Sequence, residues 1–381
     1  MGDNMLKKIL SVISASVIMM SAVNVSAETI SEEYSRSYVL MEAETHTVIR
    51  ENNGDKRVKM GSFNKLMTVL LAAEAMDRGE LSLETELVTS EHANSMQGAQ
   101  IWLMPGEKMA LGDLLKGVII GNANDACCVI AEKISGSEEK FTELMNSRAK
   151  MLGMNGTVYT DCTGMGEGNV TTAKDTALLC SELAKYKNLT PYLTCWLDTV
   201  RDGKAELVNL NRLVRTYKGV TGMKAWGSEK AGSCIAATAE KGDMSVCVVL
   251  NGCDSQENMN AEAKKLLNLA FDTYEIYTPE LPEDMVKKTV VCGGEELSVE
   301  LAPEGLYPIV IPRGTNRMVE CDFTAEEKLD APVKNGETAG EIRYTMGGEV
   351  ILEGKIVACK EVKKMNFICG IKKLVYNLLS M

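Results

Sequence analysis

Ser62 and Lys65 are the residues of this chain whose types and spacing best suit covalent chemistry. At positions i and i+3 of a helix, two side chains lie on one face within reach of each other. A lysine can act as general base for a serine hydroxyl when burial and nearby positive charge lower its pKa. The same spacing recurs at 137–140 and 147–150, where we expect surface positions. Only Ser62, preceded by Gly61 and followed by an apolar run, is predicted to begin a buried helix.

Asn122 and Asn124 lie in a second polar cluster, between an apolar run and a new helical pattern. This arrangement places several amide groups at a helix start. The simpler interpretation is N-capping by Asn124 or Asp125.

A third block, residues 219–227, contains Lys224, Ala225 and Trp226 in a glycine-rich stretch before a predicted strand. Lys224 could supply positive charge to an anionic ligand. The simpler interpretation is a turn that leads into a strand, with Lys224 solvated.

Composition and charge exclude several other classes of function. The net charge of −12 argues against a nucleic-acid binder that relies on overall basic charge. The two histidines, His46 and His92, form no H-E-x-x-H zinc motif. A Ser-His-Asp triad would have to use one of them, and Lys65 is the better candidate for the base.

Hydrophobic periodicity predicts strands, then helices, then strands again. Strands are expected at 38–41, 47–49, 232–238 and 244–251, and helices after Ser62 and at 112–118, 125–135, 138–151, 172–185 and 261–273. This order indicates an α/β (α+β) domain in which a helical cluster is inserted into an antiparallel sheet. A proline-containing linker follows at 277–282, and short alternating runs then predict a small all-β module over 276–362.

Both ends of the chain carry signals of location. Residues 1–27 contain Lys7 and Lys8, an apolar stretch and a small-x-small cleavage pattern, which predicts a signal peptide and export. Its serines and its short apolar run argue against a transmembrane anchor. Residues 363–381 combine a stripe of apolar side chains with four lysines. This basic amphipathic pattern favours a helix at a membrane surface, and packing against a partner subunit is the alternative.

The twelve cysteines all follow the predicted cleavage site. No C-x-x-C occurs, so the usual zinc and redox spacings are missing. We expect most of these cysteines to be small buried apolar residues. Whether they are thiols or disulfides stays open at this point.

Taken in order, the three blocks resemble the S-x-x-K, S-x-N and K-T-G motifs of serine penicillin-recognising enzymes. The flanking residues resemble one branch, the low-molecular-weight penicillin-binding D-alanyl-D-alanine carboxypeptidases. The matching stretches are S-F-N-K-L-M-T, L-M-P-G-E, D-L-L-K-G-V-I-I, N-D-A, N-L-N-R-L, A-G-S-C and V-V-L-N-G. The resemblance extends from about Tyr38 to Lys360 and implies a β-lactamase/transpeptidase-like domain over 28–275, followed by the β module and the C-terminal helix.

The resemblance also implies roles for individual residues. Ser62 would be the acylated nucleophile and Lys65 its base; Asn124 would orient substrate, and Lys224 would attract the peptide carboxylate. The backbone N–H of Ser62 and one from the strand after Lys224 would form an oxyanion hole. The implied reaction removes the terminal D-alanine from a peptidoglycan stem pentapeptide at the outer face of the cytoplasmic membrane or in the cell wall. It needs no metal or cofactor, and β-lactams would be acylating inhibitors.

The sequence departs from the family pattern at several positions. Asn122 stands where the family has serine, and an amide cannot relay a proton as a hydroxyl does. Ala225 replaces a threonine that donates to the substrate carboxylate, and Trp226 replaces a glycine. Asn169 stands at a usual histidine. A register through Lys230, Ala231 and Gly232 would restore the glycine but spoils the flanking match.

These departures predict altered or reduced activity. Each lost hydrogen bond to a charged group costs about 1.5–3 kcal/mol, or roughly one to two decades in rate. Two alternatives follow: a peptidoglycan-binding module that has lost turnover, and a β-lactamase that uses the same serine. The β module and the amphipathic segment argue against a freely diffusing β-lactamase.

Overall fold

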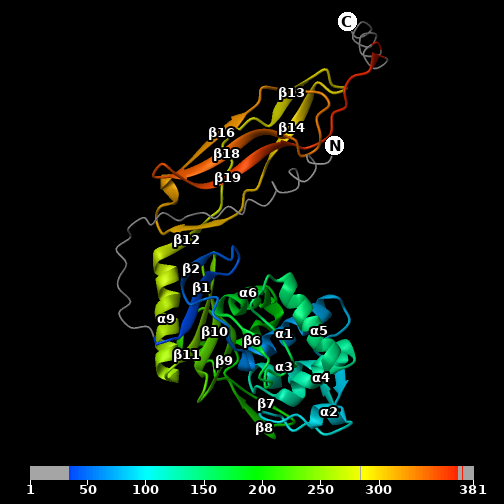
Figure 1. Ribbon diagram of the computed structural model, residues 1–381, viewed down its shortest axis with the longest axis vertical. Helices are drawn as coiled ribbons and strands as arrows, with labels where there is room; N and C mark the ends of the chain where they lie inside the picture. Colours follow the sequence, from blue (N-terminus) through cyan, green and yellow to red (C-terminus); the bar gives the residue numbers. More distant parts are fainter. Residues whose placement is uncertain (1–33, 284, 368–370, 372–381) are drawn as a thin grey trace, which may run out of the picture. The chain divides into compact units, whose positions relative to one another are not determined.

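The computed structural model describes residues 34–283, 285–367 and 371. A five-stranded antiparallel sheet forms the centre of its first domain (Figure 1). From edge to edge its strands are β2 (Val48–Asn52), β1 (Ser37–Glu42), β11 (Met244–Cys253), β10 (Gly232–Lys241) and β9 (Val220–Ser228). The first and last parts of this domain therefore meet in one sheet, with the helical segments between them.

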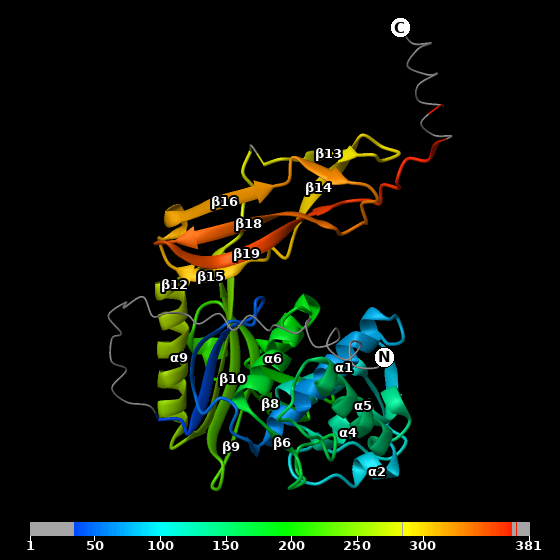
Figure 2. The ribbon, with the colours of Figure 1, turned by 45° about the horizontal axis from the view of Figure 1, so that its top comes forward.

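The middle strand β11 is buried along its whole length. Helix α9 (Gln256–Thr273) packs on one face of the sheet, and α6 (Ala173–Leu183) packs on the other (Figures 1 and 2). A strand covered on both faces needs apolar side chains on both, which explains the nearly continuous apolar run of β11.

Helices beside the sheet form a lobe around α1. The remaining helices of this domain are α1 (Asn64–Asp77), α2 (Glu91–Asn94), α3 (Leu111–Ile119), α4 (Asn124–Ser135), α5 (Glu138–Met151), α7 (Thr190–Leu193) and α8 (Leu213–Thr216). Ten consecutive residues from Asn64 to Ala73 are buried, so α1 is a core helix and not an amphipathic surface helix.

Side-chain caps fix where several helices begin. Ser137, Thr172 and Ser255 accept hydrogen bonds from the backbone N–H three residues later, at the starts of α5, α6 and α9. Ser137 therefore caps a helix, as expected for a Ser-x-x-Lys spacing outside the site.

Short elements connect these parts. They are the strand pairs β3 (Val58–Lys59) with β6 (Val170–Thr171), β4 (Glu86–Val88) with β5 (Lys108–Ala110) and β7 (Leu197–Val200) with β8 (Ala205–Val208), and the 3-10 turns η1 (Gly61–Phe63) and η2 (Lys187–Leu189). Among the described residues, no helix has the length and apolar character needed to cross a bilayer.

The C-terminal part is a second, β-rich domain. Its six-stranded sheet has the order β16 (Val319–Ala325), β18 (Thr338–Met346), β19 (Glu349–Ala358), β14 (Ser298–Glu304), β13 (Lys288–Cys292) and β17 (Lys328–Asp330). A separate strand pair joins β12 (Tyr274–Tyr277) to β15 (Ile309–Pro312), and η3 (Asn316–Met318) precedes β16. A distinct hydrophobic core contains Ile342, Tyr344 and Ile356.

The mixed architecture and the β-rich C-terminal domain predicted from the sequence are confirmed, and the predicted helices and strands agree with the observed ones to within a few residues. One assignment is wrong: Tyr277, predicted to begin the linker, is the last residue of β12 and pairs with Ile309. Its partner strand lies far along the chain, so local patterning could not show the pairing. Most of the predicted amphipathic segment 363–381 lies outside the described residues.

Candidate active site

Ser62 lies in the one-turn 3-10 helix η1 that leads directly into α1. Gly61 before it has a φ of +52°, in the left-handed region that favours glycine. Ser62 is half-buried, and its Oγ forms no hydrogen bond with any other described residue. The sequence therefore folds locally into a sharp turn that leaves the hydroxyl available.

Lys65 follows in the first turn of α1 and is almost fully buried. Its Nζ donates a hydrogen bond to the Thr163 carbonyl oxygen at 2.6 Å. Burial lowers the pKa of Lys65 below its ordinary 10.5, and the nearby Cys127, Cys162 and Asp161 offset only part of that effect. A lysine with a lowered pKa next to a serine is what general-base activation needs.

The loop that accepts the Lys65 hydrogen bond is organised by Asp161. Its Oδ1 accepts hydrogen bonds from the backbone N–H groups of Thr163 and Gly164, and its Oδ2 accepts one from Gly166. Burial alone would raise the pKa of Asp161, but these hydrogen bonds outweigh burial and hold the pKa below its usual range.

Asn169 ties this loop to α1. Its Oδ1 accepts from Asn64 Nδ2 at 3.0 Å and from the Thr160 N–H at 2.9 Å. A Cβ added at Gly164 would lie 2.1 Å from the Gly61 carbonyl oxygen. The loop therefore packs directly on the turn that carries Ser62, and only glycine fits at position 164.

Lys224 reaches the same region from β9. It is buried, and its Nζ donates to the carbonyl oxygens of Val118 and Ile119 at 2.8 and 2.7 Å. These carbonyls end α3, where the helix dipole favours a cation. Burial, and then repulsion from Lys65, lower the pKa of Lys224 well below 10.5. The interpretation of Lys224 as a solvated turn residue is therefore wrong.

Asn122 lies in the turn between α3 and α4, and Asn124 is the first residue of α4. Asn122 has a φ of +60°, and its Oδ1 is buried without a hydrogen-bond partner among the described residues. Asn124 is buried and donates from Nδ2 to the Gln97 carbonyl at 2.6 Å. The capping interpretation is wrong, because Ala123 is the N-cap residue of α4.

Trp226 and Lys224 lie on the same face of β9, whereas strand alternation places Ala225 on the opposite face. The Trp226 ring packs edge-on against Phe63, with ring centroids 6.0 Å apart and planes at 88°. A Cβ added at Gly61 would lie 2.4 Å from the indole. The indole therefore fills the space over the turn that carries Ser62. Its buried Nε1 has no hydrogen-bond partner among the described residues.

The structure thus brings Ser62, Lys65, Lys224 and Trp226 together where η1, the end of α3 and β9 meet. Ala225 belongs to the same strand but faces away. Asn122 and Asn124 follow the end of α3, and neither forms a hydrogen bond with Ser62, Lys65 or Lys224 among the described residues. Sequence reasoning missed Thr163 and Asp161, although the D-x-T-G order at 161–164 is typical of a turn held by an aspartate side chain.

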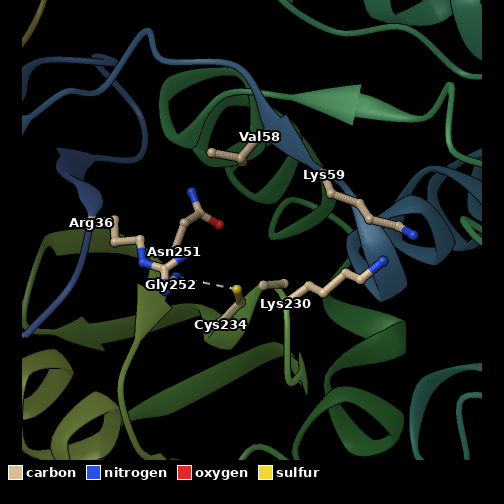
Figure 3. Close-up of a pocket in the computed structure, with 8 residues that line it drawn as sticks. Arg36, Val58, Lys59, Lys230, Cys234, Asn251 and Gly252 are labelled. Carbon is tan, nitrogen blue, oxygen red and sulfur yellow. Dashed lines mark hydrogen bonds between the residues drawn. The ribbon is translucent and has the colours of Figure 1, made fainter.

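A cavity of about 210 Å³ lies beside β10 and is lined by Arg36, Val58, Lys59, Lys230, Ala231, Cys234, Asn251 and Gly252 (Figure 3). Lys59 and Lys230 extend in the same direction in this view. Lys230 is exposed, between β9 and β10, and neither Ser62 nor Lys65 lines the cavity. Of the two lysines considered from the sequence, Lys224 is therefore the one near Lys65.

Solved structures similar to this chain define its class. Penicillin-binding protein 5 from Haemophilus influenzae has a TM-score of 0.78 at 24% identity, covering 87% of this chain and 98% of that one. Penicillin-binding protein D2 from Listeria monocytogenes, in an ampicillin-bound form, has a TM-score of 0.56 at 26% identity, covering 63% of this chain and 98% of that one. The fold is that of the penicillin-binding proteins.

Sequence comparisons define the family within that class. The profile described as D-alanyl-D-alanine carboxypeptidase matches residues 22–254, and that of the penicillin-binding protein 5 C-terminal domain matches 271–364. D-alanyl-D-alanine carboxypeptidase DacF of Bacillus subtilis (strain 168) is 36% identical over 344 residues, 89% of this chain and 88% of the relative. DacC of Escherichia coli (strain K12) is 29% identical over 87% of this chain and 85% of the relative. This chain belongs to the D-alanyl-D-alanine carboxypeptidase family of low-molecular-weight penicillin-binding proteins, which confirms the predicted resemblance.

Proposed function

We propose that this protein is an exported serine-type D-alanyl-D-alanine carboxypeptidase that removes the terminal D-alanine of peptidoglycan stem pentapeptides through an acyl-enzyme on Ser62. The observation that carries the proposal is the buried Lys65, whose pKa is lowered and which lies one helical turn from Ser62. Lys224 and Asn124 lie in the same region and could hold the peptide.

The chemistry follows from these groups. Neutral Lys65 accepts the Ser62 proton, and Ser62 Oγ attacks the carbonyl carbon between the two D-alanines. The tetrahedral oxyanion is stabilised by backbone N–H groups. The carbon–nitrogen bond then breaks as the leaving amine of D-alanine takes the proton held by Lys65. Water next attacks the ester carbonyl, its hydroxide joins the acyl carbon and its proton returns to Ser62 Oγ.

We further propose that turnover is reduced. Asn122 offers no hydroxyl for proton transfer to the leaving amine, and the Trp226 ring lies against Gly61, over the turn that carries Ser62. Ala225 faces away from Lys224 on β9, so the threonine expected there is not counted as a lost contact. The lost contact and the bulky indole together would lower kcat/KM by roughly 10² or more relative to a site with serine at position 122 and glycine at position 226.

The direct test is release of D-alanine from a synthetic pentapeptide that ends in D-Ala-D-Ala. Slow release that disappears in Ser62→Ala supports the proposal. Equal release by both proteins would contradict it, because the reaction would then not depend on Ser62.

The position of Trp226 favours one second candidate, a peptidoglycan-binding protein without turnover. In that case the chain would bind the pentapeptide, release no D-alanine, and bind equally well as Ser62→Ala. A dissociation constant measured for both proteins alongside D-alanine release separates the two candidates.

For the location, we propose the outer face of the cytoplasmic membrane or the cell wall. The support is the predicted signal peptide at 1–27 and the lysine-rich amphipathic pattern at 363–381. Phe367 and Ile371, the members of this apolar stripe that the structure describes with their side chains, are exposed.

A further inference from the structure

We infer that Cys128, Cys162, Glu138 and His92 form a binding site for a thiophilic divalent cation, with Zn²⁺ as the best fit. This site lies outside the serine site and is not required for its chemistry. Binding of the cation to this site does not depend on the function proposed above.

The geometry brings the donor atoms together. Cys128 Sγ, Cys162 Sγ and a Glu138 carboxylate oxygen all lie within 4.8 Å of one another. His92 Nε2 is 2.7 Å from Glu138 Oε2, and His92 also clusters with Cys128 and Glu132 within 4.8 Å. Cys128, Cys162 and Glu138 therefore form the three-ligand core of the site, and His92, hydrogen-bonded to Glu138 and near Cys128, is placed to complete the tetrahedral set that Zn²⁺ prefers.

The donors come from four separate elements. His92 belongs to α2, Cys128 to α4 and Glu138 to the first turn of α5, and Cys162 lies in the loop before β6. Zinc motifs are found in sequences by short spacings such as C-x-x-C, and this chain has none. The absence of a C-x-x-C motif therefore does not argue against a metal site whose ligands come from separate elements of the fold.

The donor set matches the chemistry of zinc. Two thiolates, an imidazole and a carboxylate are ligands that Zn²⁺ accepts, and thiolates select against Mg²⁺ and Ca²⁺. Binding would displace the two thiol protons to solvent and leave a complex of net charge −1.

Surrounding contacts hold the ligands in place. Glu138 Oε1 accepts the Cys162 backbone N–H at 3.1 Å, and Glu138 Oε2 lies 2.7 Å from His92 Nε2, so an ion would replace that one hydrogen bond. Glu132 Oε1 accepts from Ser90 Oγ at 2.9 Å. Such outer contacts orient the ligands in metal sites.

The two thiols are buried, whereas the His92 side chain is 49% exposed and that of Glu138 is 15% exposed. The imidazole side of the cluster therefore gives an ion a route from solvent to the thiols.

A bound ion would also act on the loop beside Lys65. Cys162 immediately precedes Thr163, whose carbonyl oxygen accepts the Lys65 hydrogen bond. Fixing Cys162 to α4 and α5 would hold that carbonyl in place; this consequence, unlike ion binding, rests on the proposed function.

The test is titration of the full, reduced and metal-stripped chain with Co²⁺, followed by competition with Zn²⁺. We expect one ion per chain by elemental analysis, thiolate-to-cobalt charge-transfer absorption, loss of that absorption when Zn²⁺ is added, and a rise in Tm with Zn²⁺.

Matched variants locate the site. Cys128→Ser and Cys162→Ser should abolish the charge-transfer band, whereas Cys180→Ser should keep it. Cys180 and Cys247 are also buried thiols in contact, but neither belongs to such a donor cluster among the described residues.

The histidine variants cover the case in which a buried cysteine variant fails to fold. His92→Asn should weaken Co²⁺ binding by about 10-fold or more, and His46→Asn, at the exposed histidine of the β1–β2 turn, should not. No charge-transfer band in the unmodified chain, or equal binding by His92→Asn and His46→Asn, would overturn the inference. D-alanine release, measured on the metal-stripped chain beside Ser62→Ala, tests the proposed function separately from ion binding.

Discussion

Among single residues, Trp226 has the largest effect on the chemistry that Ser62 can perform. Its ring lies against Gly61 and Phe63, and its Nε1 is buried without a partner among the described residues. A buried N–H without a hydrogen bond costs stability, so the ring is held by packing alone. From the sequence, the residue type was visible but not whether the indole lines the cleft or covers the turn.

Trp226→Gly should raise the rate of β-lactam acylation by about 10- to 100-fold. The change removes the indole over Gly61, so that an acyl group can approach the turn that carries Ser62. It should also lower the free energy of unfolding by about 3–5 kcal/mol, as for other buried tryptophan truncations. Quenched time courses of acylation measure the rate, and urea denaturation measures the free energy of unfolding.

Trp226→Phe is the matched control for this variant. Phenylalanine keeps an aromatic ring against Phe63 and loses only an N–H that has no partner, so the acylation rate should be unchanged. An equal rate in all three proteins would show that the indole does not limit access to Ser62.

Lys65 gives the reaction its expected pH dependence. Because burial lowers its pKa below 10.5, a growing fraction is neutral as the pH rises towards 10.5. The acylation rate should therefore rise with pH, with a midpoint below 10.5, and level off above that midpoint. Lys65→Arg should show no rise, because arginine stays protonated. A midpoint at or above 10.5 would contradict the role of Lys65 as base.

At the scale of elements, the site depends on how α1, α5, α6 and the loop before β6 are held together. The core position of α1 follows from its apolar sequence. The sequence therefore predicted that Ser62 and Lys65 lie at the start of a buried helix. The partners of Lys65 and Lys224 are backbone carbonyls of Thr163, Val118 and Ile119. Every residue type has a carbonyl, so no residue pattern could predict these contacts.

Arg148 joins three of these helices. From α5 its guanidinium contacts Glu74 of α1 and Glu182 of α6, both at 2.6 Å, and all three side chains are largely buried. Arg148→Met should lower the free energy of unfolding by about 2 kcal/mol, because it leaves two carboxylates without their shared partner.

Urea denaturation with Arg78→Met as control measures this effect. Arg78 pairs with Glu80 on the surface, where both side chains are about half exposed, and its loss should not change stability measurably. Equal stability of the Arg148 and Arg78 variants would show that the buried bridge contributes nothing.

At the scale of the whole molecule, the sequence predicted the order of the two domains because their hydrophobic patterns differ. The first domain contains continuous apolar runs, and the second contains short alternating strands. The sequence could not predict that Tyr277 pairs with Ile309 or that cysteines from different elements meet. Both are long-range contacts that depend on the folded chain.

We expect the last segment of the chain, residues 363–381, to attach the protein to a membrane, and not the two domains that precede it. Residues 28–381 should bind vesicles that contain anionic lipid, and residues 28–360 should not, because the apolar stripe and the lysines of the last segment are missing. Binding of the longer chain should weaken at high salt. Co-sedimentation measures both, and equal binding by the two chains would rule out the C-terminal anchor.

The most direct test of the central claim is the intact mass of residues 28–360 after incubation with benzylpenicillin, beside Ser62→Ala. We expect a penicilloyl adduct on the unmodified chain, formed slowly, and none on Ser62→Ala. The absence of an adduct at high drug concentration and long times would contradict Ser62 as a working nucleophile, and adducts on both proteins would show that the label does not report on this site.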